Sequence, residues 1–207
     1  MGKSVLAGRA APGEQEVPSE LYYERRWYAC YTRARHEKRV EELLRRRGFE
    51  SYLPVIPLER QWKDRKKVIP WPLFPSYVFG RFTLADVHTV LTTPGVATIV
   101  RWNGYPTPIP PHEIENVRRF AAAVAAAGIE PERRPFVTEG QWVRIVDGPF
   151  RGVEGVVVER RGRTRVLVGL QVIGQALEVN IDTQLLRPIA SCGESGESLV
   201  ARGLDQA

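Results

Sequence analysis

Three histidines and two cysteines are the side chains in this sequence best suited to nucleophilic, general-base or metal chemistry. His36, His88 and His112 lie far apart, and Cys30 and Cys192 do not have the spacing of metal ligands. Cys30 falls in an apolar stretch typical of a strand, where cysteine usually serves as a small core residue. No glycine-rich phosphate loop of the Walker or dinucleotide type is present. We therefore expect no enzymatic activity, no metal site and no cofactor.

The basic side chains suggest a different chemistry, which is contact with a polyanion. The 207 residues include 30 Lys and Arg against 24 Asp and Glu, a formal net charge of +6. Such an excess favours partners such as nucleic acid, although it can also serve solubility alone. Basic residues gather at both ends of a predicted helix over 33–47 and again over 60–67. Charge alone leaves both alternatives open, a nucleic-acid contact and a solvated face.

Aromatic side chains are concentrated in residues 72–82, a stretch that alternates with the period of a β-strand. Phe74, Tyr77 and Phe79 are more large apolar groups than one strand face needs. Two alternatives follow. Either the protein covers both faces of this strand, which is the usual fate of aromatic residues, or an aromatic cluster stays open for a partner.

Residues 25–127 alternate between strand and helix patterns. Strands are expected over 26–31, 49–56, 72–82 and 95–102, and helices over 33–47, 83–91 and 112–127. Thr83 and Asp86 have the spacing of a capping box, Asn103-Gly104 is typical of a tight turn, and Gly128 should end the last helix. This order predicts an α+β sandwich with helices packed against one sheet.

From Phe136 onward the sequence consists of short β-rich runs separated by turn residues. The runs are 141–146, 153–159, 163–170, 175–181 and 185–189, and this density of short strands predicts a small β-barrel. The predicted organisation is a disordered leader over 1–24, a domain over 25–127, a linker over 128–136, the barrel over 137–189 and a disordered tail over 190–207.

Motifs in both parts resemble the NusG family of transcription elongation factors. Trp27-Tyr28 before a basic helix, Leu73-Phe-Pro-Ser-Tyr-Val-Phe79 and Pro94-Gly-Val96 are similar to its N-terminal domain, and residues 140–155 are similar to its KOW motif. The resemblance covers about 25–189, and the wording of 61–67 and 73–79 looks closest to the specialised RfaH-like and UpxY-like antiterminators. It implies an NGN-like domain with an antiparallel sheet, followed by an SH3-like barrel of the KOW type.

The resemblance further implies a factor that binds RNA polymerase and suppresses pausing or termination. In the family an apolar depression binds the polymerase clamp helices, which favours the open-cluster alternative. The matching positions are Tyr31, Phe74, Tyr77, Phe79 and Trp102. In RfaH-like members a His-Thr-Thr-Thr run reaches the second side of the polymerase cleft, and here only His88 and Thr89 match it.

Single-stranded DNA and a second protein are the other partners that the resemblance implies. The specialised paralogues read the non-template DNA strand, and the corresponding residues are Arg33, Arg35, His36, Arg39, Thr92 and Thr93. The family's barrel binds a small-subunit ribosomal protein or the termination factor Rho, and Phe150 and Ile173 are candidate exposed contacts here. RfaH can refold this domain as a helical hairpin, whereas the β-branched runs in this sequence predict a constitutive barrel.

A function of another class also stays open. Arginines crowd the barrel at positions 144, 151, 160, 161, 163 and 165, so a ribosome-associated or RNA-binding module without effect on polymerase is the alternative hypothesis. A duplex-binding repressor would need a helix-turn-helix, which the sequence does not suggest. No apolar run has membrane-spanning length, and we expect a monomer in the bacterial cytoplasm.

Overall fold

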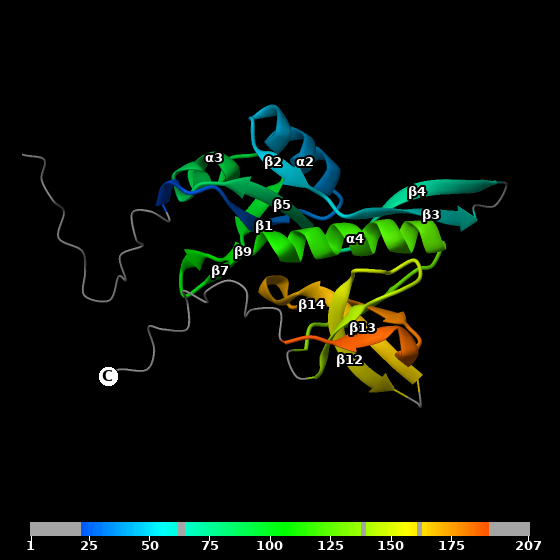
Figure 1. Cartoon of the computed structure of the whole chain (residues 1–207). Helices are drawn as coiled ribbons and strands as arrows, with labels where there is room; N and C mark the ends of the chain where they lie inside the picture. Colours follow the sequence, from blue (N-terminus) through cyan, green and yellow to red (C-terminus); the bar gives the residue numbers. More distant parts are fainter. Residues whose placement is uncertain (1–21, 62–64, 138–139, 161–162, 191–207) are drawn as a thin grey trace, which may run out of the picture.

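The computed structural model describes residues 22–61, 65–137, 140–160 and 163–190. The predicted leader and tail lie almost wholly outside these residues. The described chain forms an N-terminal sheet with helices on both sides and a C-terminal sheet that curls into a small barrel, as Figure 1 shows. The predicted class, an α+β sandwich followed by a small barrel, is confirmed. No described helix has both the length and the hydropathy needed to cross a membrane.

The N-terminal sheet is antiparallel and has the strand order β2-β5-β1-β6, with β9 also paired to β1. Its centre is the β1–β5 pair, which runs in register from Arg26 opposite Phe82 to Tyr31 opposite Tyr77. Helices α2 and α3 lie on one side of the sheet and α4 on the other (Figure 1). The bounds are β1 Arg26–Thr32, α2 Glu37–Arg46, β2 Glu50–Tyr52, β5 Tyr77–Phe82, η1 Leu84–Asp86, α3 Val87–Leu91, β6 Val96–Ile99, β9 Pro108–Ile109 and α4 Pro111–Ala127.

Two hairpins extend from this domain. The longer one joins β3, Val55–Gln61, to β4, Lys66–Pro72, and projects away from the body of the molecule (Figure 1). The shorter one joins β7, Arg101–Trp102, to β8, Tyr105–Pro106. Its turn residues Asn103 and Gly104 have φ angles of 49° and 86°, the left-handed region that favours Asn-Gly in a two-residue turn.

The C-terminal sheet is also antiparallel, with the order β10-β14-β13-β12-β11-β15. We expected residues 128–136 to be a linker, but residues 132–135 form strand β10 along β14. The charged sequence there concealed an edge strand, in which Arg134 reaches the buried Glu178 across the pair. The bounds are β10 Glu132–Pro135, β11 Trp142–Ile145, β12 Glu154–Arg160, β13 Arg163–Leu170, η2 Gln171–Ile173, β14 Gln175–Asn180, η3 Thr183–Leu185 and β15 Leu186–Pro188.

The molecule has two apolar cores. The α2-side core joins Tyr28, Cys30, Val78 and Phe82 of the sheet to Val40 and Leu44 of α2. The shared core starts from Trp27, Ala29 and Phe79 on the opposite face, continues through α4, and includes the interior of the barrel. The N-terminal domain and the barrel therefore contact each other. Cys30 is fully buried, as predicted, and burial raises the pKa of its thiol to about 12.

Local signals in the sequence placed several element ends correctly. The Thr83 backbone N–H donates to the Asp86 carboxylate, which is one half of the capping box that these two residues form, and Gly128 ends α4 in the left-handed region. The start of α2 differs from the prediction. Helix α2 begins at Glu37 rather than near residue 33, because the chain first turns through Arg35, whose φ is 65°. Thr32, the last residue of β1, is buried.

Candidate functional site

The five aromatic residues predicted to form one open cluster separate into three groups. Tyr31 and Tyr77 form an accessible pair at the end of the β1–β5 ladder, with ring centroids 5.3 Å apart at an angle of 64°. Tyr31 is exposed and Tyr77 half-buried. Burial, and secondarily the neighbouring Tyr31, raises the pKa of Tyr77. Trp102 is 71% exposed but stands on the separate β7–β8 hairpin.

Phe74 and Phe79 are buried, so the expectation that they belong to an open cluster is wrong for this structure. Their exposed fractions are 1% and 0%, and their rings pack edge to face with centroids 6.2 Å apart. Both belong to the shared core. The physical reason is the layer order: because helices cover both faces of the sheet, strand β5 buries alternate side chains on each side. The other alternative from the sequence, a strand covered on both faces, is confirmed.

A buried carboxylate connects the aromatic strand to the start of α2. The Ser76 backbone N–H donates to Glu37 Oε1 at 2.8 Å, and the Thr32 N–H donates to the Ser76 carbonyl at 2.8 Å. Ser76 has a φ of 64°, so these bonds fix a strained turn directly before Tyr77. This role of Glu37 was not predicted from the sequence, where the available signal was an acidic residue in the first turn of a helix.

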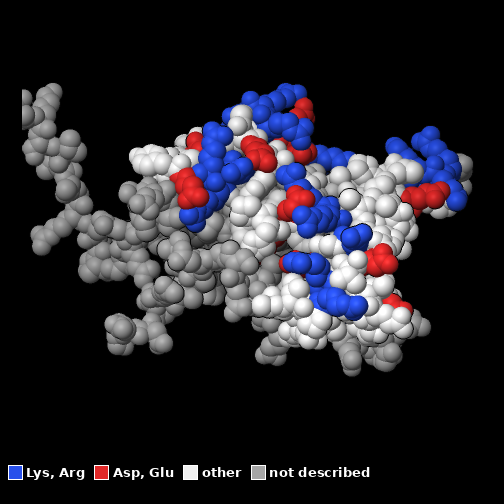
Figure 2. Space-filling model, viewed as in Figure 1, with Lys and Arg blue, Asp and Glu red and all other residues white. Residues whose placement is uncertain are grey.

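The start of α2 carries the cations that were predicted to contact DNA. Arg33, Arg35 and Arg39 are exposed, and His36 is half-buried. Figure 2 shows Lys and Arg side chains gathered over this helix. Two of the cations near its other end, Arg45 and Arg46, pair with Glu41 and Glu42 on the same helix. The charge of this surface is therefore least compensated near the helix start.

The chain segment after α3 lies directly against the start of α2. The Arg33 N–H donates to the Gly95 carbonyl at 2.9 Å. A Cβ on Gly95 would stand 2.9 Å from Val40 and 3.2 Å from His36, and the φ of this glycine is 101°. Only glycine fits so close an approach in that conformation. The structure thus brings this loop and the predicted DNA residues of α2 together.

The hydroxyl and imidazole residues on the α3 side do not all reach the surface. His88, Thr89 and Thr92 are exposed. Thr93 is 1% exposed, and its hydroxyl bonds inside the protein, to the Thr89 carbonyl at 3.2 Å. The side chain of Thr93 therefore points into the domain and does not share the surface of the other predicted DNA residues in this structure.

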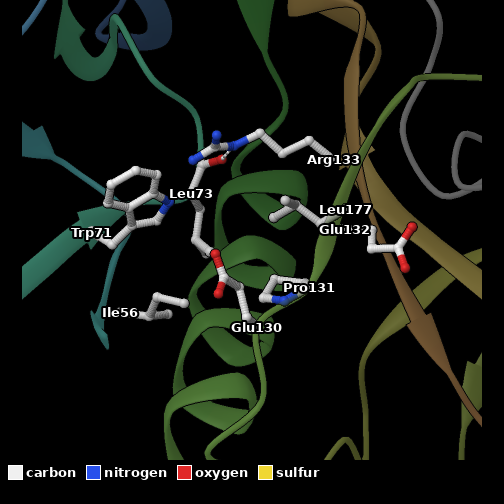
Figure 3. Close-up of a pocket in the computed structure, with 8 residues that line it drawn as sticks. All are labelled: Ile56, Trp71, Leu73, Glu130, Pro131, Glu132, Arg133 and Leu177. Atoms are coloured by element: carbon white, nitrogen blue, oxygen red, sulfur yellow. Dashed lines mark hydrogen bonds between the residues drawn. The ribbon is translucent and has the colours of Figure 1, made fainter. Parts of the chain in front are cut away.

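A pocket of about 460 Å³ lies where the long hairpin, the segment before β10 and β14 meet (Figure 3). Arg133 crosses its edge, donating to the Pro72 carbonyl at 3.0 Å and to the Leu73 carbonyl at 3.3 Å, with its guanidinium 5.2 Å from the Trp71 ring. Desolvation lowers the pKa of Arg133. Arg60 also lies 5.2 Å from Trp71 and pairs with Glu130 at 3.1 Å. These contacts join the long hairpin of the N-terminal domain to β10 and the segment before it. The pocket therefore lies at the contact between the two domains, which we call the seam.

The barrel residues predicted as exposed contacts are not both exposed. Phe150 is 6% exposed and its ring packs against Phe120 of α4, with centroids 5.9 Å apart, so the expectation of an open Phe150 is wrong for this arrangement. Ile173 in η2 is half-buried against the shared core. Two of the barrel arginines are neutralised, Arg144 by Glu154 and Arg165 by Glu178. Arg161 lies outside the described residues.

No group of acidic, histidine or cysteine side chains suited to a metal ion occurs in the described part of the chain. What the arrangement offers instead is binding. It presents a tyrosine pair at the end of a rigid ladder, a basic helix start beside it, and a second exposed polar edge at α3. Such surfaces contact a protein or a polyanion.

Both parts of the chain are similar to known proteins. Residues 25–118 match the family model described as transcription termination factor NusG, and residues 139–168 match the KOW motif. The chain is 28% identical over 176 residues to the transcription termination/antitermination protein NusG of Thermus thermophilus, covering 75% of this chain and 94% of that protein. Identity to the NusG of Deinococcus radiodurans is 27% over 180 residues, covering 75% and 95%. A solved structure described as domain interaction in Thermotoga maritima NusG is 24% identical, covers 81% of this chain and 98% of that one, and has a TM-score of 0.45.

Proposed function

Because this chain belongs to the NusG family of transcription termination/antitermination factors, which are not enzymes, we propose that it binds the RNA polymerase clamp and suppresses pausing or termination. The observation that carries the proposal is the accessible Tyr31–Tyr77 pair at the end of the β1–β5 ladder, in which Tyr31 is exposed and Tyr77 half-buried. Closeness to the specialised RfaH-like and UpxY-like members is part of the same proposal.

The tyrosine pair is suited to anchor a helical partner. Aromatic rings bury a large area with few rotatable bonds, and such residues dominate binding energies at interfaces. The ladder below them is rigid, because Glu37 fixes the turn before Tyr77 and the Phe74–Phe79 pair fills the space underneath. In this proposal Tyr31 and Tyr77 contact the clamp directly, and Phe74 and Phe79 support them. Trp102 contributes from its own hairpin.

Non-template DNA is the proposed second ligand. Arg33, Arg35 and Arg39 would neutralise backbone phosphates, which makes binding depend on salt concentration. His36 lies at the helix start, and the exposed Thr92 belongs to the segment whose Gly95 packs against His36. On the α3 side, His88 and Thr89 are proposed to contact the opposite side of the polymerase cleft. A factor held at both sides would favour the closed cleft, and pausing would fall.

The barrel is proposed to bind a further protein, either a small-subunit ribosomal protein or Rho. Phe150 is packed against α4, so it can take part only after the barrel has left the N-terminal domain. Ile173 is more accessible in the present arrangement. The arginines of the barrel motivate the alternative function, a ribosome-associated or RNA-binding module. Association with ribosomes in the absence of polymerase would favour this alternative.

The test is a binding and transcription assay with purified polymerase and the full chain. Tyr31→Ala and Tyr77→Ala should each weaken polymerase binding by about 2 kcal/mol, the size expected of an interface anchor, and should reduce pause suppression. Tyr23→Ala is the matched control, because Tyr23 is 73% exposed and lies outside the proposed surface. Wild-type affinity in folded Tyr31 and Tyr77 variants, or pausing that the unaltered protein leaves unchanged, would eliminate the proposal.

A further inference from the structure

Arg47, the residue directly after α2, makes contacts that differ from those of its basic neighbours. Arg45 and Arg46 pair with acids one turn back on their own helix. Arg47 instead reaches across to another element, where Nη1 donates to the carbonyl of Thr89 and to the hydroxyl of Thr93, the latter at 3.0 Å. The partners are 42 and 46 residues away in the sequence.

The Thr89 carbonyl is the point on which these contacts converge. It accepts from Arg47, from the Thr92 hydroxyl at 3.1 Å and from the Thr93 hydroxyl at 3.2 Å. This carbonyl lies in the last turn of α3, where backbone acceptors have no partner within the helix. A cation there also complements the negative end of the helix. Arg47 therefore caps α3 from outside and gives the buried Thr93 hydroxyl a charged donor.

The far end of the same segment is fixed to α2 as well. Gly95 accepts from the Arg33 N–H and leaves no room for a side chain beside His36 and Val40. The segment from Thr89 to Gly95 is thus held by the residue after α2 at one end and by the start of α2 at the other. Between these two points it carries the exposed Thr92.

We propose that Arg47 is a positioning residue, which sets the orientation of His88, Thr89 and Thr92 relative to the cations at the start of α2. The inference rests on the proposed function, because these residues belong to the proposed contacts with DNA and with the second side of the cleft. Arg47 acts through the α3 C-terminus and not by touching the ligand. It makes two binding elements, separate in sequence, into one surface of fixed shape.

The first measurement needs no polymerase. Amide hydrogen exchange over residues 88–95 should become about tenfold faster in Arg47→Gln, the effect of losing a hydrogen bond from a charged donor. Exchange in β1 and β5 should stay as in the unaltered protein. Arg46→Gln is the matched control, because Arg46 is an exposed cation whose described ion pair is with Glu42 of the same helix. This variant should leave amide exchange over residues 88–95 unchanged. Arg47→Lys should restore part of the protection.

The second measurement is transcription with purified polymerase. Arg47→Gln should retain most of its polymerase binding, because Tyr31 and Tyr77 are untouched, but should lose most of its pause suppression. Arg46→Gln should retain both. Unchanged exchange over 88–95 in Arg47→Gln would overturn the inference whatever polymerase does, and so would faster exchange with full pause suppression. If the unaltered protein fails to suppress pausing, the proposed function fails, while the exchange result still reports on Arg47.

Discussion

The two faces of the N-terminal sheet differ in what covers them. On one face, Tyr28, Cys30 and Phe82 pack against α2 and form a core that belongs to the N-terminal domain alone. On the other face, Trp27, Ala29 and Phe79 pack into a core that continues through α4 into the barrel. Neighbouring residues of the same strand therefore serve two different structural units.

This difference separates a fixed platform from a face that depends on domain contact. The α2 side carries the cations and the α3 edge, and its packing needs nothing from the barrel. The α4 side is completed by the Phe120–Phe150 ring contact, by paired hydrogen bonds between Asn116 and the Glu154 backbone, and by Arg133 of β10, which donates to the Pro72 carbonyl of the long hairpin. Perturbing the first face should unfold the domain, whereas perturbing the second should mainly loosen the seam.

The largest effect is expected from Phe82→Ala on the α2 side. Phe82 is fully buried and its ring lies 4.8 Å from Tyr28 and 6.1 Å from Phe49. Removing it leaves a cavity in a core that cannot collapse easily, and the free energy of unfolding should fall by about 4 kcal/mol. Urea denaturation monitored by circular dichroism measures this. Tyr23→Ala should be neutral, and a loss for Phe82→Ala below about 1 kcal/mol would refute a rigid α2-side core.

The sequence predicted the elements better than their burial. Strand β13 occurs where the β-branched run placed it, and the Thr83–Asp86 and Gly128 signals marked helix ends, because these features depend on local chemistry. Strand β10 was missed, since a charged edge strand does not have an apolar period. The start of α2 was predicted too early, because Arg35 adopts a left-handed conformation that is uncommon for arginine and cannot be predicted from its residue type.

For the aromatic stretch, the residue pattern and the family resemblance led to different predictions about which side chains are exposed. Its composition alone left open that both strand faces are covered, and Phe74 and Phe79 are indeed buried. The resemblance favoured an open cluster, which holds only for Tyr31, Tyr77 and Trp102. Whether a ring is covered depends on α4 and the barrel, elements more than thirty residues distant in the chain. In the same way, Thr92 and Thr93 are alike in type, and only the fold decides that Thr93 points inward.

A smaller effect is expected from Phe150→Ala on the seam. Phe150 is buried against Phe120 between the barrel and α4. Removing its ring should weaken the contact between the domains by about 3 kcal/mol. This is the lower limit for a buried aromatic residue, because water can fill the space that the ring leaves at the seam. Hydrogen exchange should rise on the barrel-facing side of α4 and stay low in β1. Equal deprotection of β1 would show that the shared core cannot loosen separately.

Glu113 gives the seam an expected pH dependence. It is half-buried in the first turn of α4, and by helical spacing it shares a face with Asn116 and Phe120, which contact the barrel. Burial raises the pKa of its carboxyl from 4.5 to about 7. The folded protein thus keeps the proton that the unfolded chain releases, so the destabilising contribution of Glu113 is absent below pH 4.5 and grows as the pH rises towards 7.

Glu113→Gln should remove this loss. Its advantage over the unaltered protein should be absent at low pH, grow between pH 4.5 and about 7, and then stay constant. We expect a plateau of about 2 kcal/mol, allowing for the solvent that the carboxyl keeps. Urea denaturation across this pH range measures it. Glu115→Gln, an exposed acid paired with Arg119 on the same helix, is the control. An advantage that does not depend on pH would show that burial of the charge is not the cause.

The smallest effect is expected from Asn116→Ala. The Asn116 side chain donates to the Glu154 carbonyl at 2.7 Å and accepts from the Glu154 N–H at 2.8 Å, so α4 substitutes for a neighbouring strand at the start of β12. Water can replace both partners once the seam loosens, and the cost should be about 1 kcal/mol. The change should appear as faster exchange of the Glu154 amide, with little change in global unfolding. Asn180→Ala, at an exposed position of the barrel, should have neither effect. If Asn116→Ala instead lowered global stability as much as Phe82→Ala, the two faces of the sheet would form one cooperative unit, and the distinction between platform and seam would fail.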